Sequence, residues 1–349
     1  MKKINFASDN YAGVHPTILQ ALNAANEGDC AAYGNDRWTL EAIEKFKEHF
    51  GSSSEVFFVS TGTAANVLGL STYLSSYQAV IAAETSHISS DECGAFENYT
   101  GSKIIPVKTG TGKLTVDLIA SCLTDKGNVH RVQPAVVSLS QPTELGTLYS
   151  LTELKEITAY AHQNGLSVHM DGARLCNAAA ALNVSLGSVT RECGIDVLSF
   201  GGTKNGMLGG EAVVFFDTSR ELPFNFIRKQ GMQLSSKMRF VSAQFTALLS
   251  NDLWLKNALH ANALAHLLKE QLEPVQEISL AYPTQTNALF ARIDNEIVIK
   301  NLLDTYAFYI WDHDGMEVRW MTSFSTTHEQ VLDFSQEIKK QIVLFNKSF

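Results

Sequence analysis

Residues 169–210 read HMDGARLCNAAAALNVSLGSVTRECGIDVLSFGGTKNGMLGG, and this stretch decides the fold class. Two short apolar runs, at residues 166–170 and 197–200, are each bounded by glycine or polar residues, as buried parallel strands usually are. Between them lies an alanine-rich segment, residues 175–182, with the composition of a helix. The stretch therefore predicts two parallel strands joined by a helix, which is the repeating unit of α/β folds.

Each of these predicted strands is followed by an ionisable residue, Asp171 after the first and Lys204 after the second. Ligands of open α/β sheets bind outside the carboxyl ends of the strands, so we expect both side chains to face one crevice. A desolvated lysine in a glycine-rich loop can form a Schiff base with a carbonyl, and a nearby carboxylate can keep a pyridine nitrogen protonated. The pair therefore favours pyridoxal phosphate (PLP) as cofactor. Taken singly, Asp171 could be only a helix cap and Lys204 an ordinary loop cation.

The run DGAR at residues 171–174, together with Lys204 in its glycine-rich loop, resembles the corresponding stretch of fold-type I PLP-dependent enzymes. More narrowly, it resembles the L-threonine aldolase branch of the β-eliminating lyase group, which includes phenylserine aldolases, and the resemblance covers nearly the whole chain. It implies an α/β fold with a large, mostly parallel-sheet domain that binds the cofactor and a smaller C-terminal α/β domain. We expect these domains at residues 1–245 and 246–349.

Another predicted strand, residues 55–60, is followed by the small residues Thr61 to Ala64 and then by a predicted helix. The free N–H groups and the positive dipole end of a helix N-terminus favour an anion. Gly62 would allow close backbone approach and Thr63 offers a hydroxyl, so the turn predicts a phosphate site, with a purely structural turn as the alternative. The absence of a GxGxxG motif and of a Walker lysine argues against a dinucleotide or nucleoside triphosphate site. The resemblance implies that Gly62, Thr63 and Ala64 bind the PLP phosphate.

Two histidines are candidates for contact with the cofactor and the substrate. His87 lies just past a predicted strand at residues 79–83, where an imidazole can stack on a flat cofactor, and Glu92 follows five residues later. His130 precedes a predicted strand at residues 135–139. The resemblance assigns both histidines to the active site. One of them, directly or through water, would accept the proton of the substrate's β-hydroxyl group.

The strand at residues 135–139 is followed by SQPTELG, where family members of another branch carry a Glu-Asn pair. Gln141 and Glu144 are the polar residues that could replace those contacts. The sequence leaves open which of the two does so.

Arg319 stands inside an apolar strand predicted for residues 317–321. A buried arginine is costly unless it finds an anion, and its planar fork suits a carboxylate. The resemblance places the arginine for the substrate α-carboxylate here. Arg174, closer to the cofactor, is the other candidate, and the resemblance also places Ser8 near that carboxylate. By the same resemblance, Tyr33 lies in a loop that reaches the active site of a neighbouring subunit.

The resemblance implies a PLP-dependent aldolase that cleaves L-threonine, L-allo-threonine or related β-hydroxy-α-amino acids such as phenylserine to glycine and an aldehyde. Lys204 would hold the cofactor, and Asp171 would keep its ring nitrogen protonated. A PLP-dependent β-eliminating lyase that acts on another amino acid is the alternative, because a fold does not determine which bond breaks. A non-catalytic module that binds a phosphorylated metabolite is a third interpretation, which requires Lys204 to be incidental. The resemblance implies a homotetramer, and a shared site requires at least a homodimer.

A local concentration of basic residues stands out in this acidic chain. Arg228, Lys229 and Lys237 could form a solvated charged face, or they could serve a phosphate of this subunit or of a neighbour. The sequence leaves the two interpretations open.

The composition excludes several classes of function. The 349 residues include 45% hydrophobic and 18% charged residues, as in ordinary globular proteins, and a net charge of −9 argues against non-specific nucleic-acid binding. Five cysteines without a CxxC pair indicate neither a disulfide framework nor a zinc site, and no other metal site is expected. No apolar run is long enough to span a membrane, and polar residues interrupt any signal-peptide core near residue 1. We therefore expect a cytoplasmic enzyme.

Overall fold

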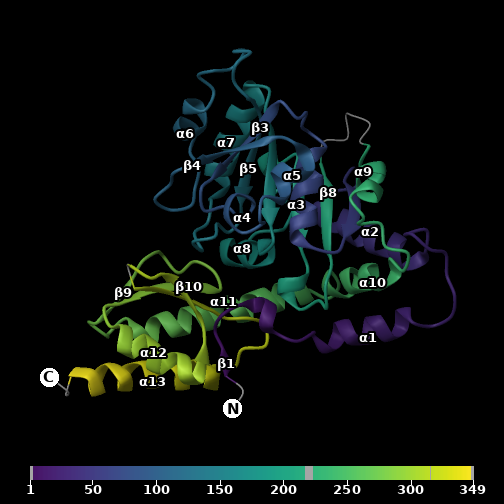
Figure 1. Cartoon of the computed structure of the whole chain (residues 1–349). Coiled ribbons are helices and arrows are strands. Elements are labelled where there is room, and N and C mark those ends of the chain that lie inside the picture. Colours follow the sequence, from purple (N-terminus) through teal and green to yellow (C-terminus); the bar gives the residue numbers. More distant parts are fainter. Residues whose placement is uncertain (1–2, 217–222, 315, 347–349) are drawn as a thin grey trace.

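A computed structural model of the chain describes residues 3–216, 223–314 and 316–346. Its larger sheet has seven strands in the order β2-β8-β7-β6-β5-β3-β4 (Figure 1). The predicted α/β class is confirmed. The strands are β2 (Glu55–Val59), β3 (Gln78–Ala83), β4 (Lys103–Val107), β5 (Gln133–Ser140), β6 (Ser167–Gly172), β7 (Val197–Gly201) and β8 (Glu211–Phe215).

Only β8 runs against the other strands of this sheet. The pairs β3/β4, β3/β5, β5/β6 and β6/β7 are parallel, whereas β7 and β2 both pair antiparallel with β8. Asp171 of β6 lies in register with Ser140 of β5 and Ser199 of β7, so these strands end side by side. Every residue of β7 is buried, as expected for a strand covered on both faces.

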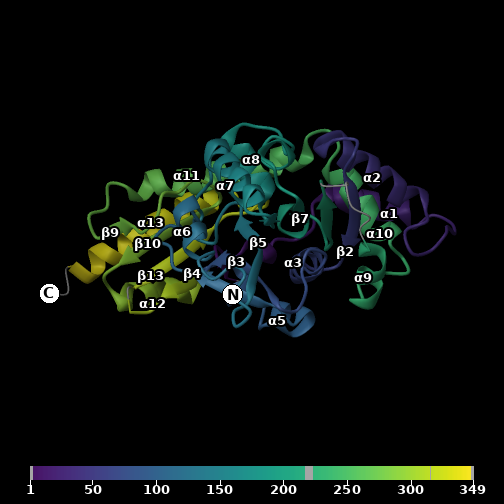
Figure 2. The same cartoon turned by 90° about the horizontal axis from the view of Figure 1, so that it is seen from above.

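Helices cover both faces of the large sheet (Figure 2). On one face lie α3 (Gly62–Ser71) and α5 (Ala95–Thr100), and on the other α7 (Leu151–Gln163) and α8 (Leu175–Leu182). The remaining helices that precede the C-terminal unit are α1 (Pro16–Ala25), α2 (Arg37–Phe50), α4 (His87–Ser90), α6 (Val116–Ser121), α9 (Phe224–Gln230) and α10 (Arg239–Leu248), with short 3-10 turns at Asp9–Tyr11, Arg191–Cys193 and Thr203–Asn205.

The C-terminal unit is built on a four-stranded antiparallel sheet in the order β12-β13-β10-β9. One face of this sheet shares a core with the helices, because Val318 and Trp320 point toward them. Side chains alternate along a strand, so Arg319 lies on the opposite face. The elements are α11 (Leu253–Leu272), β9 (Ile278–Leu280), β10 (Ala288–Ile293), α12 (Glu296–Thr305), β12 (Tyr309–Asp312), β13 (Glu317–Met321) and α13 (His328–Asn346).

The N-terminal segment packs with this C-terminal unit. Strand β1 (Ile4–Asn5) pairs in parallel with β11 (Tyr306–Ala307). Phe6 is fully buried in the same core and stacks on Phe334, with 4.4 Å between ring centres. Residues 4–6, which were expected in the large domain, therefore pack in the C-terminal core. The division into domains at residues 1–245 and 246–349 stays a prediction.

No helix in the described parts of the chain is long and apolar enough to cross a membrane. Cys30, Cys93, Cys122, Cys176 and Cys193 are all free thiols. Within the same described parts, no group of three or more histidine, cysteine, aspartate or glutamate side chains is arranged to bind a metal ion.

Candidate active site

Loops at the carboxyl ends of β2, β3, β5, β6 and β7 converge on a cavity of about 380 Å³. Parallel strands bring their carboxyl ends to one edge of the sheet, which is why segments far apart in the sequence meet here. The cavity is lined by Asn10, Ser60, Thr61, Gly62, Thr63, Ala65, Asn66, His87, Glu144, Asp171, Ala173, Ser199, Thr203, Lys204, Leu208, Gly209 and Glu211.

Lys204 lies in the tight turn between β7 and β8. A Cβ atom on Gly201 would clash with the backbone of the loop after β6, and Gly206 has a φ of +108°, so both positions favour glycine. The carboxylate of Glu211 accepts a hydrogen bond from the Gly202 N–H at 2.9 Å. The backbone on both sides of Lys204 is therefore fixed.

Glu211 is a buried carboxyl group beside this lysine, and the sequence did not predict it as a site residue. Only the reversed direction of β8 brings its first residue to the same edge of the sheet. Burial raises the pKa of Glu211 to about 7, against the opposing effects of the Thr203 hydroxyl, Lys204 and the Gly202 N–H. The charge of Glu211 consequently changes near neutral pH.

Asp171 is buried at the end of β6, with a hydrogen-bond donor on each carboxylate oxygen. The Ala173 N–H donates to Oδ1 at 3.0 Å, and the Asn66 amide donates to Oδ2 at 2.9 Å. Burial alone would raise the pKa of Asp171, but the Ala173 N–H, the charge of Lys204 and the Asn66 amide hold it below its ordinary value. Asp171 is therefore an ionised carboxylate that faces the cavity.

Asn66 connects Asp171 to His87. Its amide nitrogen also donates to Glu92 Oε1 at 2.9 Å, and this oxygen accepts a further hydrogen bond from His87 Nδ1 at 2.8 Å. The bond to Glu92 raises the pKa of His87 against the effect of partial burial, and the charges of Glu144 and Asp171 raise it further. His87 is thus an imidazole at the cavity whose pKa lies above its ordinary value.

The predicted phosphate turn lies at the same cavity. The Thr61 hydroxyl accepts a hydrogen bond from the Ala64 N–H at 3.2 Å, so this donor is already used. Gly62 and Thr63 line the cavity, whereas Ala64 is not among the lining residues. A Cβ atom added to Gly62 would meet nothing within 4 Å, so the backbone there is open to a ligand.

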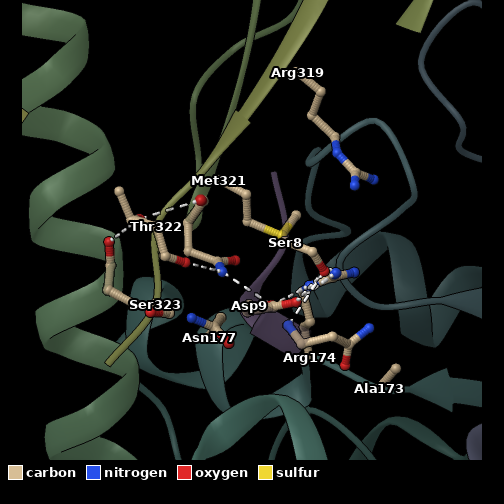
Figure 3. Close-up of polar contacts among 12 residues, drawn as sticks. Ser8, Asp9, Ala173, Arg174, Asn177, Arg319, Met321, Thr322 and Ser323 are labelled. Atoms are coloured by element: carbon tan, nitrogen blue, oxygen red, sulfur yellow. Dashed lines mark hydrogen bonds and ion pairs between the residues drawn. The ribbon is translucent and has the colours of Figure 1, made fainter. Parts of the chain in front are cut away.

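Arg174 forms an ion pair with Asp9 of the N-terminal arm, the segment at residues 7–10 (Figure 3). Its Nε and Nη2 atoms donate to the two carboxylate oxygens of Asp9, at 2.7 and 3.0 Å. Although burial opposes the charge on each group, Asp9 raises the pKa of Arg174 and Arg174 lowers the pKa of Asp9. The fork that the sequence offered to the substrate carboxylate is thus occupied by a carboxylate of the protein itself. Ser8, the neighbour of Asp9, is buried and accepts a hydrogen bond from the Asn10 N–H at 3.2 Å.

Arg319 has a different environment. Its guanidinium lies 5.0 Å from the ring centre of Tyr309 and 5.0 Å from that of Trp311, and it donates to the Ala7 carbonyl at 3.1 Å. Within the described residues no carboxylate forms an ion pair with it, and its Nε is buried without a hydrogen-bond partner. In Figure 3 it stands apart from the Arg174–Asp9 pair, without a dashed contact. Burial and the positive charge of Arg174 lower the pKa of Arg319. An anion that binds beside the guanidinium would therefore stabilise its charged form.

The loop after β5 shows which of its two polar residues faces the cavity. Gln141 is fully buried, where its amide donates to the Tyr149 carbonyl at 2.9 Å and accepts from the Tyr149 N–H at 3.0 Å. Glu144 lines the cavity, and its carboxylate has no hydrogen bond or ion pair among the residues that the structure describes. Burial raises the pKa of Glu144 against the charges of Arg174 and Lys204.

His130 and Tyr33 lie outside the cavity of their own subunit. His130 is exposed in the turn before β5, and an eight-residue strand separates it by about 25 Å from the edge of the sheet that carries the site. A histidine in this position does not reach the cavity of the same chain. Tyr33 is 49% exposed, and Lys229 Nζ lies 5.3 Å from its ring centre.

The three basic residues do not line the cavity either. Arg228 donates to the Phe58 carbonyl at 3.4 Å and lies 5.4 Å from the ring centre of Phe57, and burial lowers its pKa. Lys229 contacts the tyrosine described above, and Lys237 is exposed. In a single subunit the three residues are not arranged around one anion site.

Comparison with known proteins decides the family. A family model described as beta-eliminating lyase matches residues 5–296. The chain belongs to the beta-eliminating lyase family. It is 42% identical over 335 residues, 96% of each chain, to the low specificity L-threonine aldolase of Pseudomonas aeruginosa. The Saccharomyces cerevisiae protein of the same description is 29% identical over 84% of this chain and 76% of its own. The solved structure of Leishmania major threonine aldolase matches with a TM-score of 0.92 and 31% identity, covering 97% of this chain and 99% of that one.

The beta-eliminating lyase family uses PLP, and the residues of the cavity fit that cofactor. Lys204 offers a primary amine to an aldehyde, and Asp171 offers an ionised carboxylate to a ring nitrogen. The open backbone at Gly62, the first residue of α3, offers a cradle to a phosphate. Lys204, Asp171, Gly62 and Thr63 would thus hold the group, with His87 at the cavity beside them.

Asn66, Asp9 and Glu211 are residues at the site of this beta-eliminating lyase chain that were not predicted from the sequence. Asn66 carried a local signal, because it is the one polar side chain in the otherwise apolar helical run AANVLGL. Asp9 carried none, since its partner Arg174 lies 165 positions away. Glu211 could have been found only from the reversed direction of β8.

Proposed function

We propose that the chain is a PLP-dependent aldolase that cleaves L-threonine, L-allo-threonine or a related β-hydroxy-α-amino acid such as phenylserine to glycine and an aldehyde. One observation carries the proposal. Lys204 and Asp171 face one cavity in a chain that is 42% identical to a low specificity L-threonine aldolase over 96% of its length.

The cofactor side of the site follows from the geometry above. The Lys204 amine would bind the cofactor aldehyde, and Asp171 would hold a proton on its ring nitrogen. Bound PLP supplies an electron sink for the pair of electrons left on Cα when a bond to Cα breaks. Gly62 and Thr63 would donate to the phosphate, and His87 would lie against the ring.

The substrate side depends on the two arginines. Arg319 has no protein carboxylate as a partner in the described parts of the chain, so it would bind the substrate α-carboxylate. Arg174 is held by Asp9 and would position this edge of the cavity, with Ser8 in the same arm as a further contact for the carboxylate. Binding at Arg319 would orient the substrate and so favour cleavage of one bond over another.

Product analysis tests the reaction. The purified protein, loaded with PLP, is incubated with L-threonine, L-allo-threonine, phenylserine and L-serine, and glycine, aldehyde, keto acid and ammonia are measured. Glycine and aldehyde in equal amounts from the β-hydroxy acids are expected. Keto acid with ammonia would show that the chain is a β-eliminating lyase acting on another amino acid instead. A protein that takes up no PLP would overturn both interpretations.

We also propose a cytoplasmic homotetramer, or at least a homodimer. Tyr33 and His130 are exposed and lie outside the cavity of their own subunit, which supports a contribution to a neighbour. Five free cysteines fit a reducing compartment. Sedimentation equilibrium of the PLP-loaded protein tests the assembly, and a fully active monomer would overturn it.

A further inference from the structure

The proposed function assigns no role to Glu144. It lines the cavity that also holds Lys204 and His87, and it is partly buried. Its carboxylate has neither a hydrogen bond nor an ion pair in the described parts of the chain, whereas Asp171 accepts two hydrogen bonds and Glu211 accepts one. A partly buried carboxylate has lost part of its hydration, and here no protein group replaces it, so a molecule in the cavity that donates a hydrogen bond to Glu144 would stabilise this carboxylate.

The groups around Glu144 do not satisfy it, although their charges act on it. These groups are Arg174, Lys204, Asp171 and His87. Arg174 is occupied by Asp9, and Asp171 is itself an anion. What remains is a carboxylate that can accept a hydrogen bond or a proton from a molecule in the cavity.

His87, the other candidate for accepting a proton, is less suited to that task. Its Nδ1 donates to Glu92, and the nearby charges of Glu144 and Asp171 raise its pKa further. Only the neutral form of an imidazole has a lone pair that can accept a proton, so a raised pKa narrows the pH range in which His87 can act as a base. Burial, in contrast, raises the pKa of Glu144, which brings a carboxylate closer to the neutral range where general bases are effective.

We propose that Glu144 accepts the proton of the substrate's β-hydroxyl group as the Cα–Cβ bond breaks, an inference that rests on the proposed aldolase function. The O–H electron pair becomes the second C–O bond of the aldehyde, and the Cα–Cβ pair stays on Cα. One proton is later delivered to Cα and one leaves Glu144, so that the substrate divides into aldehyde and glycine without a net change in protons.

The test compares a reaction that needs the hydroxyl group with one that does not. The PLP-loaded wild type, Glu144→Gln and Glu84→Gln are assayed for aldehyde release from L-allo-threonine and phenylserine. The same proteins are assayed by proton NMR for exchange of the glycine α-proton in D₂O. Glu84 is exposed, lies at the end of β3 and does not line the cavity, so it is a matched control.

We expect Glu144→Gln to lower kcat for cleavage by about 10²–10⁴-fold, which is the usual contribution of one general base. Exchange of the glycine α-proton should stay within about 3-fold of the wild type, and Glu84→Gln should match the wild type in both assays. Cleavage that stays within about 10-fold of the wild type would overturn the proposal. A parallel loss of cleavage and exchange would also overturn it, because Glu144 would then support binding of the cofactor or of the carboxylate.

Two further measurements do not depend on a single variant. Formate added to Glu144→Ala should restore cleavage without changing glycine exchange, and the absence of rescue in a folded variant would count against proton transfer at this position. In the unloaded protein, an NMR titration should show a lower pKa for His87 in Glu144→Gln than in the wild type, and no change in Glu84→Gln. An unchanged His87 pKa would show that the two groups are not close enough to act on one substrate.

The outcomes separate this inference from the proposed function. A wild type that exchanges the glycine α-proton but cleaves no β-hydroxy acid would contradict the aldolase itself. If the wild type cleaves these substrates and Glu144→Gln cleaves them equally fast, only the role of Glu144 is contradicted.

Discussion

Two groups of polar and charged side chains, in or near the cavity, differ in how their charges are matched. The sheet-edge network consists of Asn66, His87, Glu92 and Asp171, which are joined by hydrogen bonds of 2.8 to 2.9 Å. The open pair consists of Glu144, from the loop after β5, and Arg319, from the C-terminal sheet. In the described parts of the chain, neither member of the open pair has an oppositely charged partner in contact.

The difference indicates which ligand each group serves. A cofactor that stays bound through many turnovers is held best by groups that are fixed in advance, because little reorganisation is then needed during the reaction. A substrate that arrives and leaves can supply the missing partners itself, with its carboxylate for Arg319 and its hydroxyl group for Glu144. The four predictions below test this division, from the largest expected effect to the smallest.

Removal of the Lys204 amine should prevent covalent attachment of the cofactor. We expect Lys204→Ala to lose all turnover, and we expect borohydride treatment of the PLP-loaded wild type to leave a covalent adduct on the peptide that contains Lys204. Lys229 and Lys237 serve as internal controls, because they do not line the cavity. An adduct mapped to either of them would place the cofactor outside the network.

Removal of the charge at Asp171 should affect chemistry more than binding. Asp171→Asn keeps the shape of the side chain but no longer holds a proton on a ring nitrogen. We expect kcat to fall on the order of 10²–10³-fold, as when one preorganised electrostatic group is removed, with PLP uptake and circular dichroism retained. Turnover near that of the wild type would show that Asp171 serves only to accept the hydrogen bond of the Ala173 N–H and has no role in catalysis.

Much of the fold could be predicted from the sequence because its signals are local. The apolar runs before Asp171 and Lys204 are strands β6 and β7, and the alanine-rich segment between them includes α8. The direction of a strand also shows which end its flanking residues occupy. His130 precedes β5, so the strand order alone could have excluded it from the carboxyl edge of its own sheet.

The partners of the site residues could not be predicted in this way. The pairing of Arg174 with Asp9 joins two segments through tertiary packing, and no periodic pattern links them. The same packing draws residues 4–6 into the C-terminal unit through β1 and the ring of Phe6. The sequence predicted Lys204, Asp171 and both arginines as site residues, but only the structure distinguishes the arginine that already has a carboxylate from the one that does not.

Glu211 is a further buried carboxyl group beside the sheet-edge network. Unlike Asp171, whose pKa is lowered, it has a pKa raised to about 7. The unfolded chain releases this proton near the ordinary value of 4.5, whereas the folded protein releases it near 7. Between these values the folded state binds more protons, so the contribution of Glu211 to stability is lost as the pH rises, by up to about 3 kcal/mol. The groups that face it are Thr203, Lys204 and Asp171.

Glu211→Gln cannot titrate and should remove that part of the pH dependence. We expect the free energy of unfolding of the unloaded wild type to fall more steeply between pH 5 and pH 8 than that of the variant. Urea unfolding at the two pH values measures the difference, and other groups such as His87 contribute equally to both proteins. Identical slopes would mean that Glu211 is not strongly perturbed in the folded state.

The smallest effect, and the most direct test of the open pair, concerns Arg319. Arg319→Lys keeps the positive charge but loses the planar fork, so the carboxylate of any amino acid should be bound less well. We expect KM to rise about 10-fold, or about 1.4 kcal/mol, for L-allo-threonine, phenylserine and, in the synthetic direction, glycine alike. The melting temperature should change little, because among the described residues the Arg319 guanidinium donates one hydrogen bond, to the Ala7 carbonyl, and a lysine can keep the contact with the rings of Tyr309 and Trp311.

Arg292→Lys is the matched control for this substitution. Arg292 lies on the adjacent strand β10 and pairs with Glu317 at 3.5 Å, so it already has a protein carboxylate. The control should leave KM unchanged for every substrate. A rise in KM confined to the bulky β-substituent of phenylserine would place Arg319 at the side-chain pocket instead. An equal rise for Arg292→Lys would show that the C-terminal sheet had shifted, and would remove the distinction between matched and unmatched charges on which the assignment rests.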